Sequence, residues 1–197
     1  MTGAAELSGR GGSLVGAGAA ENTEAALEEF APPEITVLGV GNVVLSDEGF
    51  GVRLAEILDA AYDFPENVQV LDGGTLGLEL LRFVTGTRKL LILDAVRTDE
   101  HRGGCYRFAG EEAKAHFREK LSAHEIGIQD VLTFLEITGK TPDEVVVIGA
   151  APRTLDAGLS LSPEMESLLP QAAAMAAAEL TRWGARLKRK DGTENEA

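Results

Sequence analysis

Three acidic residues and one histidine of this 197-residue chain stand in turns or at strand ends that follow apolar runs. Catalytic and metal-binding side chains are often found at such positions. Glu48 lies in a Gly-rich turn, Asp72 and Asp94 come at or near the ends of the next two runs, and His124 stands in a polar turn before a helical pattern. The carboxyl ends of parallel strands form the edge of an open sheet where ligands bind. Carboxylates and an imidazole at that edge would suit a divalent transition metal with open coordination positions, such as nickel, zinc or iron.

Each of these residues also has a structural interpretation. Asp72 precedes two glycines and is of the kind that forms an Asx-type turn, and a strand-end aspartate such as Asp94 often caps the next helix. A lone histidine such as His124 is commonly a surface group. Asp47, next to Glu48, stands where a helix dipole favours an acidic residue, and we expect it to cap that helix.

The Gly-rich turn in Gly39–Val52 is not typical of a nucleotide site. A dinucleotide fingerprint needs a third glycine where Val44 stands, and the Gly-Lys-Ser/Thr ending of a phosphate-binding loop is absent from the sequence. The Asp47 and Glu48 carboxylates would also repel a pyrophosphate. A Rossmann-type nucleotide enzyme therefore stays an alternative that these residues disfavour. Neither a His-Glu-x-x-His pattern nor a Gly-x-Ser-x-Gly pattern occurs, so the sequence matches no conventional protease signature of these kinds.

Short β-branched and Leu-rich runs alternate with segments of helical period, which is typical of parallel βαβ units. The predicted strands cover residues 35–41, 68–71, 89–93, 144–148 and, more weakly, 106–108. Several of them are apolar on both faces, as strands covered by helices on both sides are. We therefore predict an α/β fold, a three-layer α/β/α sandwich around a mostly parallel sheet, of the kind found in phosphorylases and hydrolases.

Four helices are predicted from apolar stripes. The first three stripes are Phe50, Leu54, Ile57, Leu58 and Ala61; Leu76, Leu80, Phe83 and Val84; and Ile128, Val131, Leu132 and Leu135. The last helix is expected to begin with Ser162 as N-cap and Pro163 at its first position, and to end near Gly184.

Composition divides the chain into three parts. Residues 1–33 are rich in Gly, Ala and Glu and are expected to form a flexible extension, residues 34–184 a single folded domain, and residues 185–197 a charged tail. The basic cluster of the tail is expected to complement the dipole of the preceding helix. His101, in a polar loop, and His116, in a charged helical stretch, are interpreted as solvated surface residues.

The charge balance excludes several classes of partner. Lys and Arg number 18 against 32 Asp and Glu, so the formal net charge is −14, and the sequence pI is about 4.6. A chain this acidic is expected to bind neither nucleic acid nor an anionic membrane surface. Cys105 is the one cysteine and cannot form an intramolecular disulfide, and no secretion signal or membrane span is recognised. We expect a cytoplasmic monomer.

Five blocks of the sequence, in order, resemble the hydrogenase maturation endopeptidases. They are GVGNVVLSDEGFGVR, LDGGTLGLELL, LILDAV, SAHEIGIQDVL and VVVIGAAPRTLDAGLSLSP, and the likeness covers about residues 35–183. Proteins of this family remove a C-terminal peptide from the large-subunit precursor of nickel-iron hydrogenases. The resemblance implies a three-layer α/β/α fold and a metal site at Glu48, Asp94 and His124.

The resemblance also implies a mechanism in which the metal is nickel already mounted in the precursor. Glu48, Asp94 and His124 would bind that nickel, Glu48 and Asp94 would take part in catalysis, and Asp72 is a candidate for a nearby carboxylate that helps to activate water. The isolated protein would then hold metal weakly, because two carboxylates repel each other without a cation. The alternative is a non-catalytic, nickel-sensing chaperone or checkpoint module that docks the same precursor.

Overall fold

The computed structural model describes residues 33–96, 104–119 and 127–192. The extension predicted for residues 1–33 lies outside this part of the chain, apart from its last residue, and so do His101 and His124. None of the helices in the described segments combines the length and the apolarity that crossing a bilayer requires.

A central sheet of five strands organises the described residues. The strands are β1 (Ile35–Val40), β3 (Val68–Gly74), β4 (Lys89–Ala95), β5 (Cys105–Ala109) and β6 (Glu144–Ala150), in the spatial order β3-β1-β4-β6-β5. Four of them run parallel, and β5 is antiparallel to β6 at one edge. The predicted mostly parallel sheet is confirmed, and its weakest predicted strand is the antiparallel edge strand.

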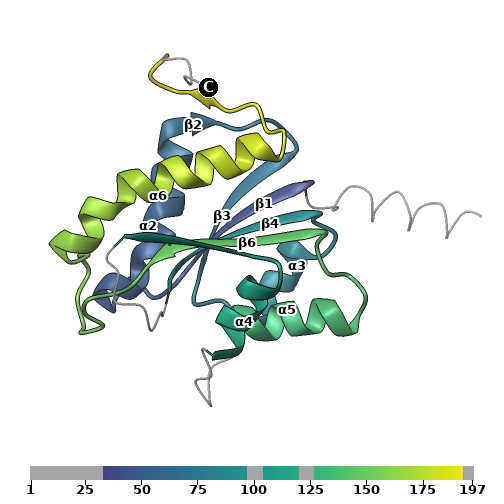
Figure 1. Ribbon diagram of the computed structural model, residues 1–197, viewed down its shortest axis with the longest axis horizontal. Helices are drawn as coiled ribbons and strands as arrows, with labels where there is room; N and C mark the ends of the chain where they lie inside the picture. The colour runs from purple at the N-terminus through teal and green to yellow at the C-terminus, as the bar shows by residue number, and fades with distance from the viewer. Residues whose placement is uncertain (1–32, 97–103, 120–126, 193–197) are drawn as a thin grey trace, which may run out of the picture. The chain divides into compact units, whose positions relative to one another are not determined.

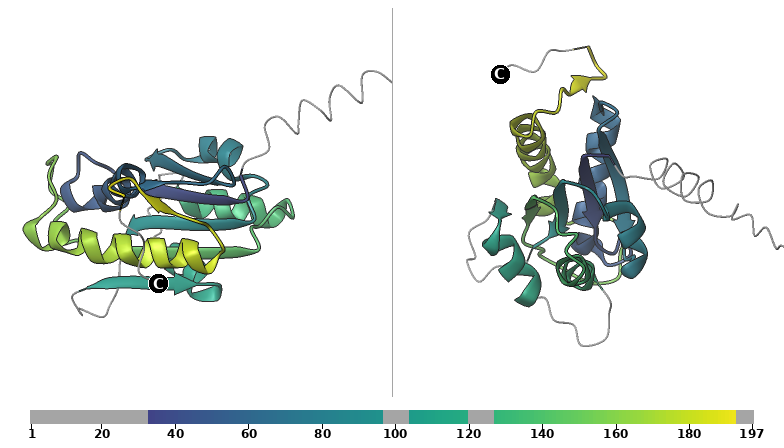
Figure 2. Two further views of the ribbon diagram at one scale, coloured as in Figure 1. Left: turned by 90° about the horizontal axis from the view of Figure 1, so that it is seen from above. Right: turned by 90° about the vertical axis from the view of Figure 1, so that its right-hand side faces the viewer.

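Helices cover both faces of this sheet, as Figures 1 and 2 show. One face carries α2 (Phe50–Ala61) and α6 (Pro163–Arg182), and a short 3₁₀ turn, η1 (Ser46–Gly49), precedes α2. The opposite face carries η2 (Leu78–Leu80), α3 (Leu81–Val84), α4 (Glu111–Glu119) and α5 (Ile128–Ile137). The three-layer α/β/α architecture is therefore confirmed.

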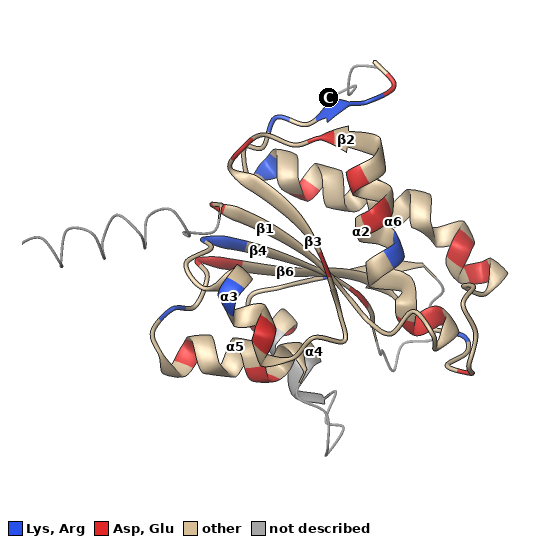
Figure 3. Cartoon of the chain, turned by 180° about the vertical axis from the view of Figure 1, so that it is seen from behind, with Lys and Arg blue, Asp and Glu red and all other residues tan. Residues whose placement is uncertain are grey.

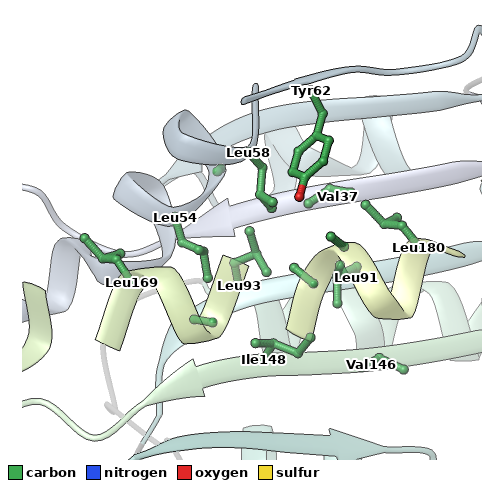
Figure 4. Close-up of a cluster of buried hydrophobic side chains, with 14 of the residues drawn as sticks. Val37, Leu54, Leu58, Tyr62, Leu91, Leu93, Val146, Ile148, Leu169 and Leu180 are labelled. Atoms are coloured by element: carbon green, nitrogen blue, oxygen red, sulfur yellow. The ribbon is translucent and has the colours of Figure 1, made fainter. Parts of the chain in front are cut away.

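Alternation along the strands supplies the two apolar cores. Val37, Leu91 and Leu93 point towards α2 and α6, whereas Leu38 and Ile92 point towards α3 and α5. All five are fully buried. Figure 4 shows Leu54 and Leu58 of α2 and Leu169 and Leu180 of α6 lying over the strands of the first face. Each fully buried side chain of this size contributes about 1.5–3 kcal/mol relative to an exposed one.

Helix α6 begins where its cap residues predict. Ser162 is the N-cap, its Oγ accepts a hydrogen bond from the Met165 N–H at 3.4 Å, and Pro163 is the first helical residue. Gly184 follows the helix with a φ of +90°, a conformation that glycine adopts without steric strain. The second predicted helix is shorter than its stripe indicates, because the chain is helical only over η2 and α3, and Leu76 precedes both and is 44% exposed.

The folded part of the chain continues past Gly184. A short strand β7 (Lys188–Arg189) pairs antiparallel with β2 (Tyr62–Asp63), which directly follows α2. The Lys190 ammonium donates to the Asp59 carbonyl at 2.6 Å. Basic residues of the predicted tail thus lie at the C-terminal end of α2, where cations complement the dipole, rather than at the end of α6.

His116 is not a solvated residue, so that prediction was wrong. It lies on α4, is 7% exposed, and its ring stacks on Phe108 of β5 with centroids 5.1 Å apart. Glu111 and Glu112 of the same helix are exposed, whereas Ala113 and His116 are buried, so the tertiary packing decides on which face the histidine lies.

Candidate active site at the carboxyl edge of the sheet

Close packing of glycines presses the start of α2 onto the carboxyl ends of β1 and β4. A Cβ added to Gly51 would lie 2.0 Å from the Leu93 carbonyl oxygen, and one added to Gly41 would lie 1.9 Å from the Glu48 carbonyl oxygen. Gly41 also has a φ of +130°. η1, which carries the half-buried Glu48, therefore lies in contact with β4. The Gly-rich turn serves this close approach of helix and strand.

Gly51→Ala tests this packing. We expect a loss of about 3 kcal/mol in the free energy of unfolding, because the new methyl group meets backbone atoms that have no room to move. Urea denaturation followed by circular dichroism would measure it. The matched control is Gly127→Ala, where an added Cβ meets nothing within 4 Å and φ is −119°. Equal losses in both variants would contradict the packing argument.

Asp94 is the last residue but one of β4, close to this helix start. It is 2% exposed and lies in register with Gly149 of β6. By alternation it shares a face with Ile92 and Val96, and that face is covered by α5. The predicted metal ligand His124 stands in the segment 120–126, which is outside the described residues and ends just before α5.

Asp72 lies elsewhere on the same edge. It is exposed, and its Oδ1 accepts a hydrogen bond from the Gly74 N–H at 2.8 Å, the Asx-type turn contact that its sequence context indicates. In the register of the sheet it stands beside Gly39 of β1, on the α2 face, whereas Asp94 belongs to the opposite face. Since β1 separates their strands, the two backbones are about 10 Å apart. Asp72 thus has a structural role, and its role in water activation stays a prediction.

Asp47 does not cap its own helix, so the expectation made for it was wrong. Its carboxylate is fully buried and binds the segment that leads into α6. It accepts hydrogen bonds from the backbone N–H groups of Arg153 (2.8 Å), Thr154 (3.0 Å) and Ser162 (2.6 Å) and from the Ser162 hydroxyl (2.9 Å). Burial by itself raises the pKa of Asp47, but the four donors outweigh it and hold that pKa below its ordinary value of 3.8.

The two loops that Asp47 joins form one unit beside Glu48. Val44 and Ser46 exchange backbone hydrogen bonds with Gly158 at 3.0 and 2.9 Å, and the Ser46 hydroxyl donates to the Asp156 carbonyl at 2.9 Å. Ser46 is held at a φ of +49°, in the left-handed region. Nothing in the sequence near Asp47 signals this partner, which is more than a hundred residues away along the chain.

The described residues place two of the predicted metal ligands at this edge. Glu48 and Asp94 supply carboxylate oxygens, which suit a divalent cation. Within the described segments, no three His, Cys, Asp or Glu side chains gather in a way that would hold a metal ion. A complete ligand set would therefore need a contribution from outside them.

The fold and this edge define an α/β protein with carboxylates at the end of a parallel sheet. Comparison with known proteins narrows the class. Residues 52–179 match the model of the hydrogenase maturation protease family. The chain is 39% identical over 139 residues to the hydrogenase 2 maturation protease of Escherichia coli strain K12, covering 70% of this chain and 85% of that protein. It is 40% identical over 153 residues to the hydrogenase expression/formation protein HoxM of Cupriavidus necator, covering 76% and 75%.

Solved structures agree with these sequence matches. The hydrogenase maturating endopeptidase HybD from E. coli superimposes with a TM-score of 0.76 at 35% identity, covering 81% of this chain and 99% of that one. The chain belongs to the hydrogenase maturation protease family. It is a peptidase, so the family resemblance of the five sequence blocks is confirmed, and neither the non-catalytic checkpoint module nor the nucleotide-binding alternative is favoured.

Proposed function

We propose that this peptidase matures a nickel-iron hydrogenase by removing the C-terminal peptide of the large-subunit precursor once nickel has been inserted. The relatives named above are hydrogenase maturation proteases, which supports the reaction class. The observation that carries the proposal is the packing of η1, with Glu48, against β4, whose end carries the buried Asp94. This contact between the turn of Glu48 and the strand of Asp94 supports a shared role for the two carboxylates.

In this proposal nickel arrives with the substrate. Glu48 and Asp94, with His124, bind the nickel of the precursor through its open positions. The two carboxylates repel each other when no cation is present, and a cation relieves that repulsion. The protease would therefore recognise precursors that are loaded with metal and pass over those that are not. Nickel bound in this way supplies a Lewis acid that polarises a carbonyl or lowers the pKa of water.

Acidic side chains carry the hydrolysis in this proposal, which makes the enzyme an aspartic-type endopeptidase. Glu48 and Asp94 would orient the scissile bond, and Asp72 is proposed as an additional carboxylate for water activation through its second oxygen. We further propose that the protein acts in the cytoplasm as a monomer. Its single cysteine and its net charge of −14 are consistent with both.

Intact-mass spectrometry of the precursor tests the reaction. The nickel-loaded and nickel-free forms of the large-subunit precursor are each incubated with and without this protein. We expect a C-terminal peptide to be lost from the loaded form alone. Cleavage of both forms would contradict nickel recognition, and a stable complex without mass loss would support the checkpoint module instead.

A further inference from the structure

A group of exposed apolar side chains borders the Glu48 loop. Val44 is 52% exposed, Leu155 45% and Leu159 69%, and they come from the two loops that Asp47 and Gly158 join. Large apolar side chains on a surface are common singly, but a cluster beside an active site marks a binding surface. We call these three residues and the groove next to them the docking face.

The groove lies between α2 and the start of α6 and has a volume of about 310 Å³. Its apolar lining comes from Ile57, Leu159, Leu161 and Leu169. Ile57 belongs to the apolar stripe of α2, yet it is 36% exposed, so this part of the stripe lacks a full cover among the described residues. The groove is wide enough for one large apolar side chain, and its Leu159 directly follows Gly158, which pairs with the loop before Glu48.

The docking face is held in a fixed shape although its side chains are exposed. The buried Asp47 carboxylate takes four hydrogen bonds from the segment before α6, and Arg53 of α2 donates to the Leu159 carbonyl at 3.4 Å. A surface that is ordered before binding loses less conformational entropy when a partner arrives. Rigid, exposed apolar loops are therefore suited to binding a polypeptide.

Charge around the groove indicates what the partner presents. The groove is lined by Glu56, Glu166 and Arg53, and Arg53 forms an ion pair with Glu56 at 2.9 Å. That pair leaves the exposed Glu166 as the net charge of the lining among the described residues. The first turn of α6 carries a second acidic residue, Glu164, and Figure 3 shows both acidic positions at this end of the helix. A basic side chain next to an apolar one complements this arrangement.

We propose that the docking face binds a segment of the precursor polypeptide in which a large apolar side chain, seated in the groove, neighbours a Lys or Arg beside Glu166. The inference rests on the proposed function and assigns to this face the affinity for the substrate, apart from the nickel at the catalytic edge. Arg53 of the groove lies in the first turn of α2, directly after the η1 turn that carries Glu48, so occupation of the groove would hold the precursor at this end of the molecule.

Steady-state cleavage by Leu159→Ser tests the apolar contact. We expect KM for the nickel-loaded precursor to rise about tenfold, equivalent to about 1.4 kcal/mol, with kcat unchanged. The matched control is Ile137→Ser, which removes an 80% exposed apolar side chain from the end of α5 on the other face of the sheet. It is expected to keep the wild-type KM. Thermal unfolding of both variants checks that the fold is kept.

Glu166→Lys and Glu166→Gln test the charge contact. The lysine variant is expected to raise KM more than the glutamine variant, and both are expected to weaken the dependence of KM on ionic strength. The matched control is Glu136→Gln, which removes an exposed carboxylate from α5 and is expected to leave KM and its salt dependence unchanged.

The outcomes separate this inference from the proposed function. Wild-type KM in Leu159→Ser and Glu166→Lys, with the wild-type protein cleaving normally, overturns the docking face and leaves the function intact. An uncut precursor with the wild-type protein overturns both. Sedimentation velocity tests whether a second copy of this chain occupies the docking face instead. If the wild-type protein is a dimer that Leu159→Ser dissociates, and KM is unchanged, the face is a contact between two copies and the inference is overturned.

Discussion

Glu48→Gln is expected to lower the rate of precursor cleavage by about a hundredfold or more, the effect usual for removing one acid–base or electrostatic group from an active site. The amide keeps the size of the side chain but loses the negative charge that binds a cation. Because Glu48 is only half-buried in η1 and the amide keeps the size of the side chain, we expect the melting temperature to stay close to that of the wild type. Intact-mass kinetics with the nickel-loaded precursor measures the rate.

The control for this prediction is the same Glu→Gln substitution at a glutamate far from the candidate active site. Glu136→Gln, on the exposed side of α5, should cleave at the wild-type rate. Asp94→Asn should also lose activity, but a loss of stability is expected with it because Asp94 is 2% exposed. A Glu48→Gln protein that processes the precursor at the wild-type rate would remove Glu48 from the active site.

Asp47→Asn is expected to lower the free energy of unfolding at neutral pH by about 3 kcal/mol. Its two carboxylate oxygens together accept from three backbone N–H groups and one hydroxyl. Whichever oxygen becomes an amide NH₂, at least one backbone N–H then faces another donor in a buried position. Urea denaturation measures the loss. The control is Asp143→Asn, which removes an exposed ion pair with Arg88 and is expected to cost less than about 1 kcal/mol.

The effect of Asp47→Asn also depends on pH, with a definite sign. The pKa of Asp47 is lowered in the folded chain, so the unfolded chain takes up this proton first as the pH falls. The stability that the carboxylate contributes is fully present above its unfolded pKa of 3.8 and is lost as the pH falls through the folded pKa. The difference between the wild type and the variant should therefore shrink in acid. A difference that grows below that pH would contradict the role of the ionised carboxylate.

Local patterns in the sequence were sufficient for the layers of this fold. The strands β1, β4 and β6 are apolar on both faces, and a strand of that kind needs helices on both sides. The start of α6 was equally predictable, since Ser162 and Pro163 act within one turn of the helix. The second apolar stripe predicted a helix that includes Leu76, but Leu76 lies before the helical turns and is 44% exposed.

Contacts between distant segments were beyond the reach of these patterns. Asp47 looks like a helix cap in its own neighbourhood, and its four donors lie in a segment more than a hundred residues away. The pairing of Lys188 with Asp63 and the stacking of His116 on Phe108 have the same character. Such contacts depend on how the layers are assembled, and no local spacing encodes them.

By itself, the sequence determined the α/β/α class, the strand order along the chain and the acidic residues that follow the strands, because hydrophobic period and capping act over a few residues. The tertiary structure decided which of those residues meet. The turn that carries Glu48 contacts the strand of Asp94, and Asp72 lies on the other face of the sheet from Asp94. The buried Asp47 carboxylate joins two loops by hydrogen bonds. The physical reason is that a carboxylate's role depends on its neighbours in space, and close glycine packing and sheet register choose those neighbours.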